Sequence, residues 1–196
     1  MEKTTGFKLE KFPYNTKNEE LKKSIDAVIA VQATSLEARI AALSEYGKEL
    51  YKKGLTFHEK LTKTITSPDW AELDTTKEYS SYSMKGEGGF ICVKSVAVLA
   101  CTPIEVLAYI KMEQYKQDYD ESYIGGKEIE VYPANMRLAL WNFKGKLFVS
   151  NRDFVLLQHS IFNEDGSINV AVSSVEDPRA PPTDNVRGRI LVYTLI

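Results

Sequence analysis

The side chains with the chemistry for catalysis or metal binding are few, and their spacing forms no known site. His58 falls in a predicted helix and His159 in a predicted strand, without a Ser or Cys in the Gly-x-Ser-x-Gly pattern of a nucleophile elbow. Cys92 and Cys101 have no second ligand beside them, so we expect reduced core thiols rather than a zinc site or a disulfide. Residues 86–89 separate two predicted strands, which indicates a hairpin turn rather than a phosphate loop. We therefore expect no enzyme activity, no metal and no cofactor.

Side chains that could bind a ligand are more evident. On the predicted strand 135–143, alternation places one set of residues on a common face: Arg137, Ala139, Trp141 and Phe143. The indole of Trp141 could bind a quaternary ammonium group, at about 1–2 kcal/mol when desolvated, or could simply pack in the core. Lys116 and Asp120 have the i,i+4 spacing of a surface ion pair, which would contribute only about a few tenths of a kcal/mol.

Helical periodicity dominates the first part of the chain. From Asn18 to Gly54 apolar residues recur mostly at three- and four-residue steps, which predicts an amphipathic helical stretch that ends at Gly54. Thr34 and Glu37 have capping-box spacing, which indicates a break or restart inside it. A shorter amphipathic helix is predicted over residues 56–65. Such a stripe either docks on the chain's own sheet or binds a partner.

After Trp70 the hydrophobic period becomes two, with Gly-, Pro- and Asn/Asp-rich turns between the apolar segments. Strands are predicted at residues 79–84, 90–100, 128–143, 148–162, 168–175 and 186–196. A helix interrupts them: Thr102 is a suitable N-cap, Pro103 suits the first turn, and the pattern continues to about Tyr115. This order predicts an α+β fold with an antiparallel sheet curved around a helix.

Composition fits one domain and argues against several classes of protein. With 196 residues, 43% of them apolar, the chain can close a sizeable core. The net charge of −2, with both signs mixed, gives no footprint for nucleic acid. No apolar run is long enough to span a bilayer, and none has the flanks of a signal peptide. We expect a cytoplasmic protein that is peripheral to membranes.

Five features in the second half of the chain occur in a specific order. They are the Arg-Asp-aromatic-Val strand at 152–155, the Asn-Glu-Asp-Gly turn at 163–166, the Ser-Val-acidic segment at 174–177, the proline-rich loop at 178–182 and the Val-Arg strand at 186–187. In this order they resemble the START domain, the lipid-binding module named after the steroidogenic acute regulatory protein. The resemblance runs from about residue 69 to 196. It implies a helix-grip fold, in which a curved antiparallel sheet surrounds an internal lipid cavity.

The resemblance also assigns roles to individual residues. Lys116 and Asp120 occupy positions where phosphatidylcholine-transfer members carry a basic residue for the phosphate and a nearby carboxylate. Trp141 falls where those members have an aromatic side chain against the choline. Sterol-carrying members place a buried acid and a buried base at positions that match Ala139 and Gln158, so the resemblance favours a phospholipid over a sterol.

Two further sets of residues follow from the resemblance. The cavity is expected to be lined by Ala139, Trp141, Phe143, Phe154, Leu156 and Gln158, with Arg137 on the same face. Arg152, Asp153 and Arg187 belong to the family motif, and we interpret them as structural. An Arg-Asp pair at the start of a strand is better suited to fix a hairpin than to contact lipid.

The hypothesis from sequence is a non-enzymatic module that binds a phospholipid and transfers it between membranes, with transient contact to the membrane surface. The alternatives are a regulatory scaffold that acts through its N-terminal helices, and an enzyme on the helix-grip fold such as a cyclase. The expected division is a flexible arm over 1–16, a helical segment over 17–68 and a START-like domain over 69–196. Because the sequence ends before the closing helix of START domains, we expect an open cavity that is covered by the N-terminal helix, by a domain swap or by a homodimer.

Overall fold

The computed structural model describes residues 19–145, 148–190 and 193–195, so the predicted arm over 1–16 lies outside the described residues. The helices are α1 (Glu19–Gln32), α2 (Leu36–Ala41), α3 (Glu45–Ile65), α4 (Pro103–Lys111) and α5 (Lys116–Tyr119), with short 3-10 helices η2 (Glu87–Gly89) and η3 (Glu113–Tyr115). The strands are β1 (Ala71–Thr75), β2 (Tyr79–Lys85), β3 (Ile91–Ala97), β4 (Tyr123–Tyr132), β5 (Met136–Phe143), β6 (Arg152–Phe162), β7 (Ile168–Ser174), β8 (Val186–Arg187) and β9 (Tyr193–Leu195). The predicted α+β class is confirmed.

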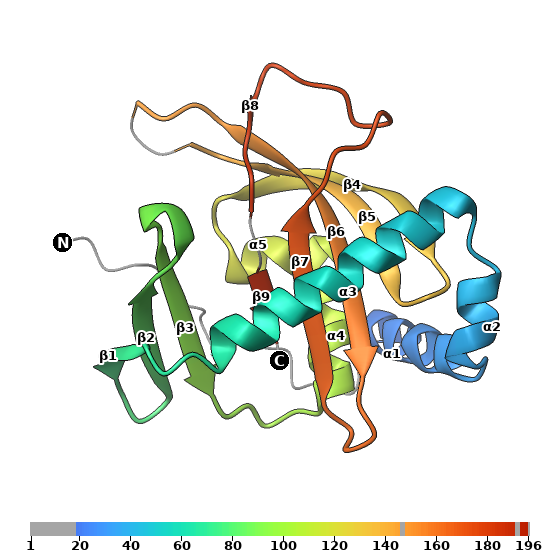
Figure 1. Cartoon of the computed structure of the whole chain (residues 1–196), viewed down its shortest axis with the longest axis horizontal. Coiled ribbons are helices and arrows are strands. Elements are labelled where there is room, and N and C mark those ends of the chain that lie inside the picture. Colours follow the sequence, from blue (N-terminus) through green and yellow to red (C-terminus); the bar gives the residue numbers. More distant parts are fainter. Residues whose placement is uncertain (1–18, 146–147, 191–192, 196) are drawn as a thin grey trace.

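The strands form two sheets. A six-stranded sheet runs β4-β5-β6-β7-β9, with β8 pairing in parallel with β6, and a three-stranded sheet runs β1-β2-β3. The remaining pairings are antiparallel. Figure 1 shows the smaller sheet to one side of the larger one. The larger sheet therefore carries most of the core and positions the candidate site.

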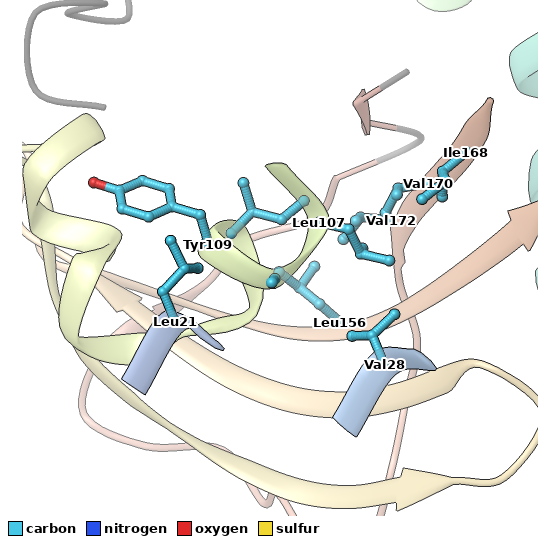
Figure 2. Close-up of a cluster of buried hydrophobic side chains, with 10 residues drawn as sticks. Leu21, Val28, Leu107, Tyr109, Leu156, Ile168, Val170 and Val172 are labelled. Atoms are coloured by element: carbon cyan, nitrogen blue, oxygen red, sulfur yellow. The ribbon is translucent and has the colours of Figure 1, made fainter. Parts of the chain in front are cut away.

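Each face of the larger sheet packs against different helices (Figure 1). Helix α3 covers one face, where Leu50 packs with Leu138 and Leu157. Helices α1 and α4 cover the other face. Figure 2 shows the side chains of α1 and α4 gathered against those of β6 and β7 in one cluster: Leu21, Val28, Leu107, Tyr109, Leu156, Ile168, Val170 and Val172. This second face is the one that alternation assigns to the ligand.

The N-terminal helices break at two serine caps. Ser35 accepts a hydrogen bond from the amide of Ala38 at the start of α2, and Ser44 accepts one from Gly47 at the start of α3. The predicted break near Thr34 is confirmed, although the capping residue is its neighbour. The predicted end at Gly54 is wrong, because α3 continues to Ile65.

Several predicted boundaries on the C-terminal side are also wrong. Residues 128–143 form two strands, because the chain turns back at Asn135, whose φ is +58°. The segment 148–162 becomes a strand only at Arg152, and 186–196 holds two short strands instead of one. The helix that begins at Thr102 ends at Lys111, before η3 and α5.

Candidate functional site

Strands β5 and β6 place the predicted ligand-facing residues on one face. Antiparallel register sets Arg137 opposite Gln158, Ala139 opposite Leu156, and Trp141 opposite Phe154. Residues that pair directly across two antiparallel strands point to the same side of the sheet. This side continues onto β7 and packs against α1 and α4 through Leu156, Phe154 and Trp141. The sequence therefore brings the predicted set together, with apolar residues in the middle and polar ones at one end.

Arg137 anchors the polar end of this face. Its side chain is only 5% exposed, its Nε donates to Gln158 Oε1 at 3.0 Å, and one terminal nitrogen donates to the carbonyl of Lys111 at 2.8 Å. The carboxylate of Glu128 lies 3.9 Å away, too far for a hydrogen bond. Burial is the main reason that the pKa of Arg137 is lowered, with Glu113 and Glu128 opposing the effect. The guanidinium is therefore held in place mainly by a side-chain amide and a helix end.

Lys116 is a second buried cation beside Arg137. Its side chain is 2% exposed, and Nζ donates to the carbonyl of Ile110 at 3.0 Å and lies 4.0 Å from the centre of the Trp141 ring. The nearest carboxylate oxygen in its ion pair, on Glu113, is 3.9 Å from Nζ. Burial, and next the charge of Arg137, lower the pKa of Lys116 to about 7. Near neutral pH, the charged lysine is thus destabilised by its surroundings.

Helix α4 explains why two cations gather here. Thr102 and Glu105 form a capping box at its start, and the helix ends at Lys111, where Met112 is extended. The carbonyl groups of the last turn have no partners within the helix and carry partial negative charge. Two of these carbonyls, on Ile110 and Lys111, accept from Lys116 and Arg137. The cations therefore cap α4 as well as face the sheet.

The structure does not pair Lys116 with Asp120. The carboxylate of Asp120 instead accepts from the hydroxyl of Ser122 at 2.6 Å and from its amide at 3.0 Å. Lys116 turns inward instead, where its ammonium donates to Ile110 and lies over the Trp141 ring. The two side chains therefore form no ion pair with each other, Lys116 lies against the predicted face at Trp141, and their role toward a headgroup stays a prediction.

Sequence reasoning missed Glu113 and Tyr123. The phenol of Tyr123 donates to Glu113, which raises the pKa of that phenol, with burial as the largest cause. Both side chains line a pocket of about 290 Å³, together with Gln114, Gln117, Gly125 and Gly126. Glu113 falls within the predicted helix 102–115, so no periodicity signal distinguishes it from a surface residue. Glu113 comes to face Lys116 only because α4 ends at Lys111 and the chain then changes direction into η3.

A family model for the START domain matches residues 58–196. The chain belongs to the START family. Solved structures of 41 chains resemble it. Human StAR-related lipid transfer protein 5 matches with a TM-score of 0.64 and 21% identity, over 72% of this chain and 71% of that one. The STAR-related lipid transfer protein of Xanthomonas axonopodis matches with a TM-score of 0.57 and 18% identity, over 65% of this chain and 73% of that one. Human STARD10 matches with a TM-score of 0.58 and 17% identity, over 68% of this chain and 56% of that one. A comparison with curated protein sequences found no match.

Two of the START motif residues, Asp153 and Arg187, form an ion pair at the start of β6 in which the carboxylate is buried and the guanidinium is partly exposed. Asp153 is fully buried and accepts from Arg187 Nε at 2.6 Å and from the Thr183 hydroxyl at 2.7 Å. Burial would raise the pKa of Asp153, but these hydrogen bonds outweigh burial and hold it below its usual range. Arg152 is exposed and donates to the carbonyl of Ser150. The partner of Asp153 in this START domain is therefore Arg187 on β8, not its neighbour Arg152.

The two histidines meet on the opposite face of the START sheet, where His58 of α3 packs against His159 of β6. The rings of His58 and His159 are 5.0 Å apart, and His58 Nε2 is 3.1 Å from the carbonyl of His159. Among the described residues, no three His, Cys, Asp or Glu side chains are placed to hold a metal ion. A search of the same residues finds no helix with the length and hydrophobicity needed to cross a bilayer.

Proposed function

We propose that this START domain binds a phospholipid and carries it between membranes without chemical change. The observation that carries the proposal is one continuous face of β5 and β6, apolar in its middle, with Arg137 at one end and Lys116 of α5 over the Trp141 ring. Acyl chains match the apolar part, and a headgroup phosphate matches the cations. The names of structural neighbours support the same class, because the human and Xanthomonas proteins are described as lipid transfer proteins.

Transfer needs little net energy from the protein. Burying a methylene group gains about 0.8 kcal/mol relative to water, and a bilayer offers nearly the same gain. Moving a lipid from a membrane to a protein groove is thus close to neutral in free energy. The protein contributes by lowering the barrier to leaving the membrane, which requires a gate at the membrane surface.

Two loops supply candidates for that gate. In the loop between β5 and β6, the side chains of Phe148 and Val149 are exposed, and such a tip can enter the interfacial layer of a membrane. The second loop, residues 177–185, carries three prolines and is tied to β5, because Asn185 donates to Asn142 at 3.2 Å. Opening either loop would expose the end of the face where Trp141 and Phe154 lie.

A vesicle assay tests the proposal. Donor vesicles would carry fluorescent phosphatidylcholine, fluorescent phosphatidic acid or a fluorescent sterol, and acceptor vesicles would carry none. We expect transfer of at least one phospholipid at a rate that rises with protein concentration, and native mass spectrometry of the protein purified from cells should show a bound phospholipid. Protein that is empty and transfers none of the three lipids would contradict the proposal and favour a scaffold role. A product altered in mass would favour an enzyme.

A further inference from the structure

We infer that the lipid bound by this domain carries an anionic group, a phosphate or carboxylate, that binds in a buried donor cluster formed by Lys116, Arg137, Gln158 and Trp141. The inference rests on the proposed lipid-binding function and names the class of headgroup. It differs from the choline-centred expectation, which places a cationic group against Trp141.

The charge balance of the donor cluster calls for an anion. Lys116 and Arg137 are nearly fully buried, yet the carboxylate oxygens in their ion pairs, on Glu113 and Glu128, are each 3.9 Å away. A buried cation without a close counterion is costly, and an anion placed at hydrogen-bond distance offsets that cost. The lowered pKa of Lys116, about 7, has the same origin, since burial and Arg137 both disfavour its charged form. Binding an anion here would stabilise the charged lysine.

Two further donors in the donor cluster lack partners. Among the described residues, Gln158 Nε2 and Trp141 Nε1 are buried and have no hydrogen-bond acceptor. The amide of Gln158 is oriented by Arg137, which donates to its oxygen and so leaves the NH₂ group free. An unpaired buried donor costs about 1–3 kcal/mol, which a ligand oxygen would recover. All four residues can donate, which suits an oxyanion.

The same geometry disfavours choline. The ammonium of Lys116 lies 4.0 Å from the Trp141 ring centre, and the guanidinium carbon of Arg137 lies 5.8 Å from it. A quaternary ammonium group binds an aromatic ring through this same cation–π attraction. Because a cation already occupies the ring, a second one would meet like-charge repulsion in a poorly solvated site. The donor cluster therefore discriminates between headgroups by charge.

Glu113 provides a built-in substitute for the ligand anion. Its Oε1 is buried without a hydrogen bond and faces Lys116 at 3.9 Å, while Tyr123 donates to the other oxygen. The side chain is 35% exposed and lines the 290 Å³ pocket, so it has room to turn outward. An incoming anionic oxygen would replace this loose ion pair with a hydrogen-bonded one.

Binding of tail-matched fluorescent lipids to the full chain tests the inference. The lipids are phosphatidic acid, phosphatidylcholine and uncharged diacylglycerol, each presented in phosphatidylcholine vesicles. We expect phosphatidic acid to bind on the order of ten-fold more tightly than phosphatidylcholine, in line with a charge-assisted hydrogen bond. If the three lipids bind equally, the headgroup inference fails while the proposed function stands. If none binds, the proposed function itself fails.

Variants assign the effect to the donor cluster. K116M should lower the affinity for phosphatidic acid much more than the affinity for diacylglycerol, whereas the exposed control K127M should change neither. E113Q should raise the affinity for phosphatidic acid several-fold, because it removes the competing carboxylate, with E72Q as the exposed control. A lower affinity in E113Q, or an equal loss for all lipids in folded K116M, would overturn the inference.

Two further measurements remain informative if K116M does not fold. Q158L removes the unpaired amide donor without removing a charge, and it should lower the preference for phosphatidic acid by about five-fold, near the loss of one hydrogen bond. An unchanged preference in Q158L would count against the donor cluster. Inorganic phosphate is the second probe: tight binding of free phosphate that blocks no lipid would assign the donor cluster to a soluble anion and contradict a lipid headgroup.

Discussion

Among single residues, Arg187 should matter most for stability, because its partner Asp153 is fully buried. Removing one member of a buried ion pair leaves an uncompensated charge, which costs about 3–5 kcal/mol. Since the Arg187 side chain is 34% exposed, we expect the lower end of this range for R187M, measured by urea unfolding. The control is R152M, at the first residue of β6 and exposed, which should cost less than about 0.5 kcal/mol. Equal losses in both variants would show that Asp153 does not depend on Arg187.

A second residue-scale prediction concerns pH and the buried histidine pair. Burial, and next the nearby His58, lower the pKa of His159 to about 4, and burial also lowers the pKa of His58. The unfolded chain keeps a histidine pKa near 6.5, so it binds more protons than the folded chain between pH 6.5 and about 4. Stability is therefore fully present above pH 6.5 and falls through this window, by about 3 kcal/mol for His159.

Urea unfolding at several pH values checks this dependence. The groups packed around His159 are the imidazole of His58, the Tyr51 ring at 5.2 Å and the backbone of Gly54, so His58 is the one that also titrates in this range. H159L should flatten the profile below pH 6.5, although it also changes the packing under α3. A profile that stays equally steep in H159L would place the acid sensitivity elsewhere in the molecule.

At the scale of elements, caps were predictable from sequence and long-range packing was not. The start of α4 at Thr102 follows from local chemistry, because a capping box needs only residues three apart. Local pattern predicts a helix end at Gly54, yet a Cβ there would lie 2.8 Å from His159 Nδ1, so the glycine allows close approach of α3 to β6. That reason depends on a residue more than a hundred positions away, and no local pattern contains it.

In the candidate site, too, local features were predictable from sequence and features set by tertiary packing were not. Period-two alternation correctly placed Arg137, Trp141 and Gln158 on one face, because parity along a strand is a local property. The inward turn of Lys116 and the involvement of Glu113 depend on where α4 ends and on which ring lies beneath. Spacing alone favoured Asp120 as the partner of Lys116, and tertiary packing overrode it.

Helix α1 gives the element-scale prediction. It precedes the START match at residues 58–196, yet Leu21 and Val28 pack in the same cluster as Leu107 and Leu156 (Figure 2). V28A should therefore cost about 1–2 kcal/mol of unfolding free energy through lost burial and a small cavity. Ile29 is the adjacent control: it is 52% exposed, and I29A should be nearly neutral. A neutral V28A would show that α1 is not docked on this face in solution.

At the scale of the whole molecule, the two sheets differ in how well they are covered. The larger sheet has helices on both faces, whereas the smaller one exposes a group of large apolar side chains: Leu73, Phe90, Ile91, Val93, Val96 and Val98. Within the described residues, β3 pairs with β2 on one edge and with no strand on the other. Exposed apolar patches and open strand edges are common sites of association.

We therefore expect the chain to self-associate through the smaller sheet as its concentration rises. Ile91 and Val93 lie on one face of β3 and are 75% and 63% exposed, so the double variant I91T/V93T keeps β-branched residues while it lowers the apolar area. Light scattering should show a mass that increases with concentration for the wild type and much less for the variant. The matched control I29T changes an exposed residue on the outer side of α1 and should associate like the wild type. A wild-type mass that stays monomeric over the whole range would mean that the smaller sheet is covered in solution by another part of the chain.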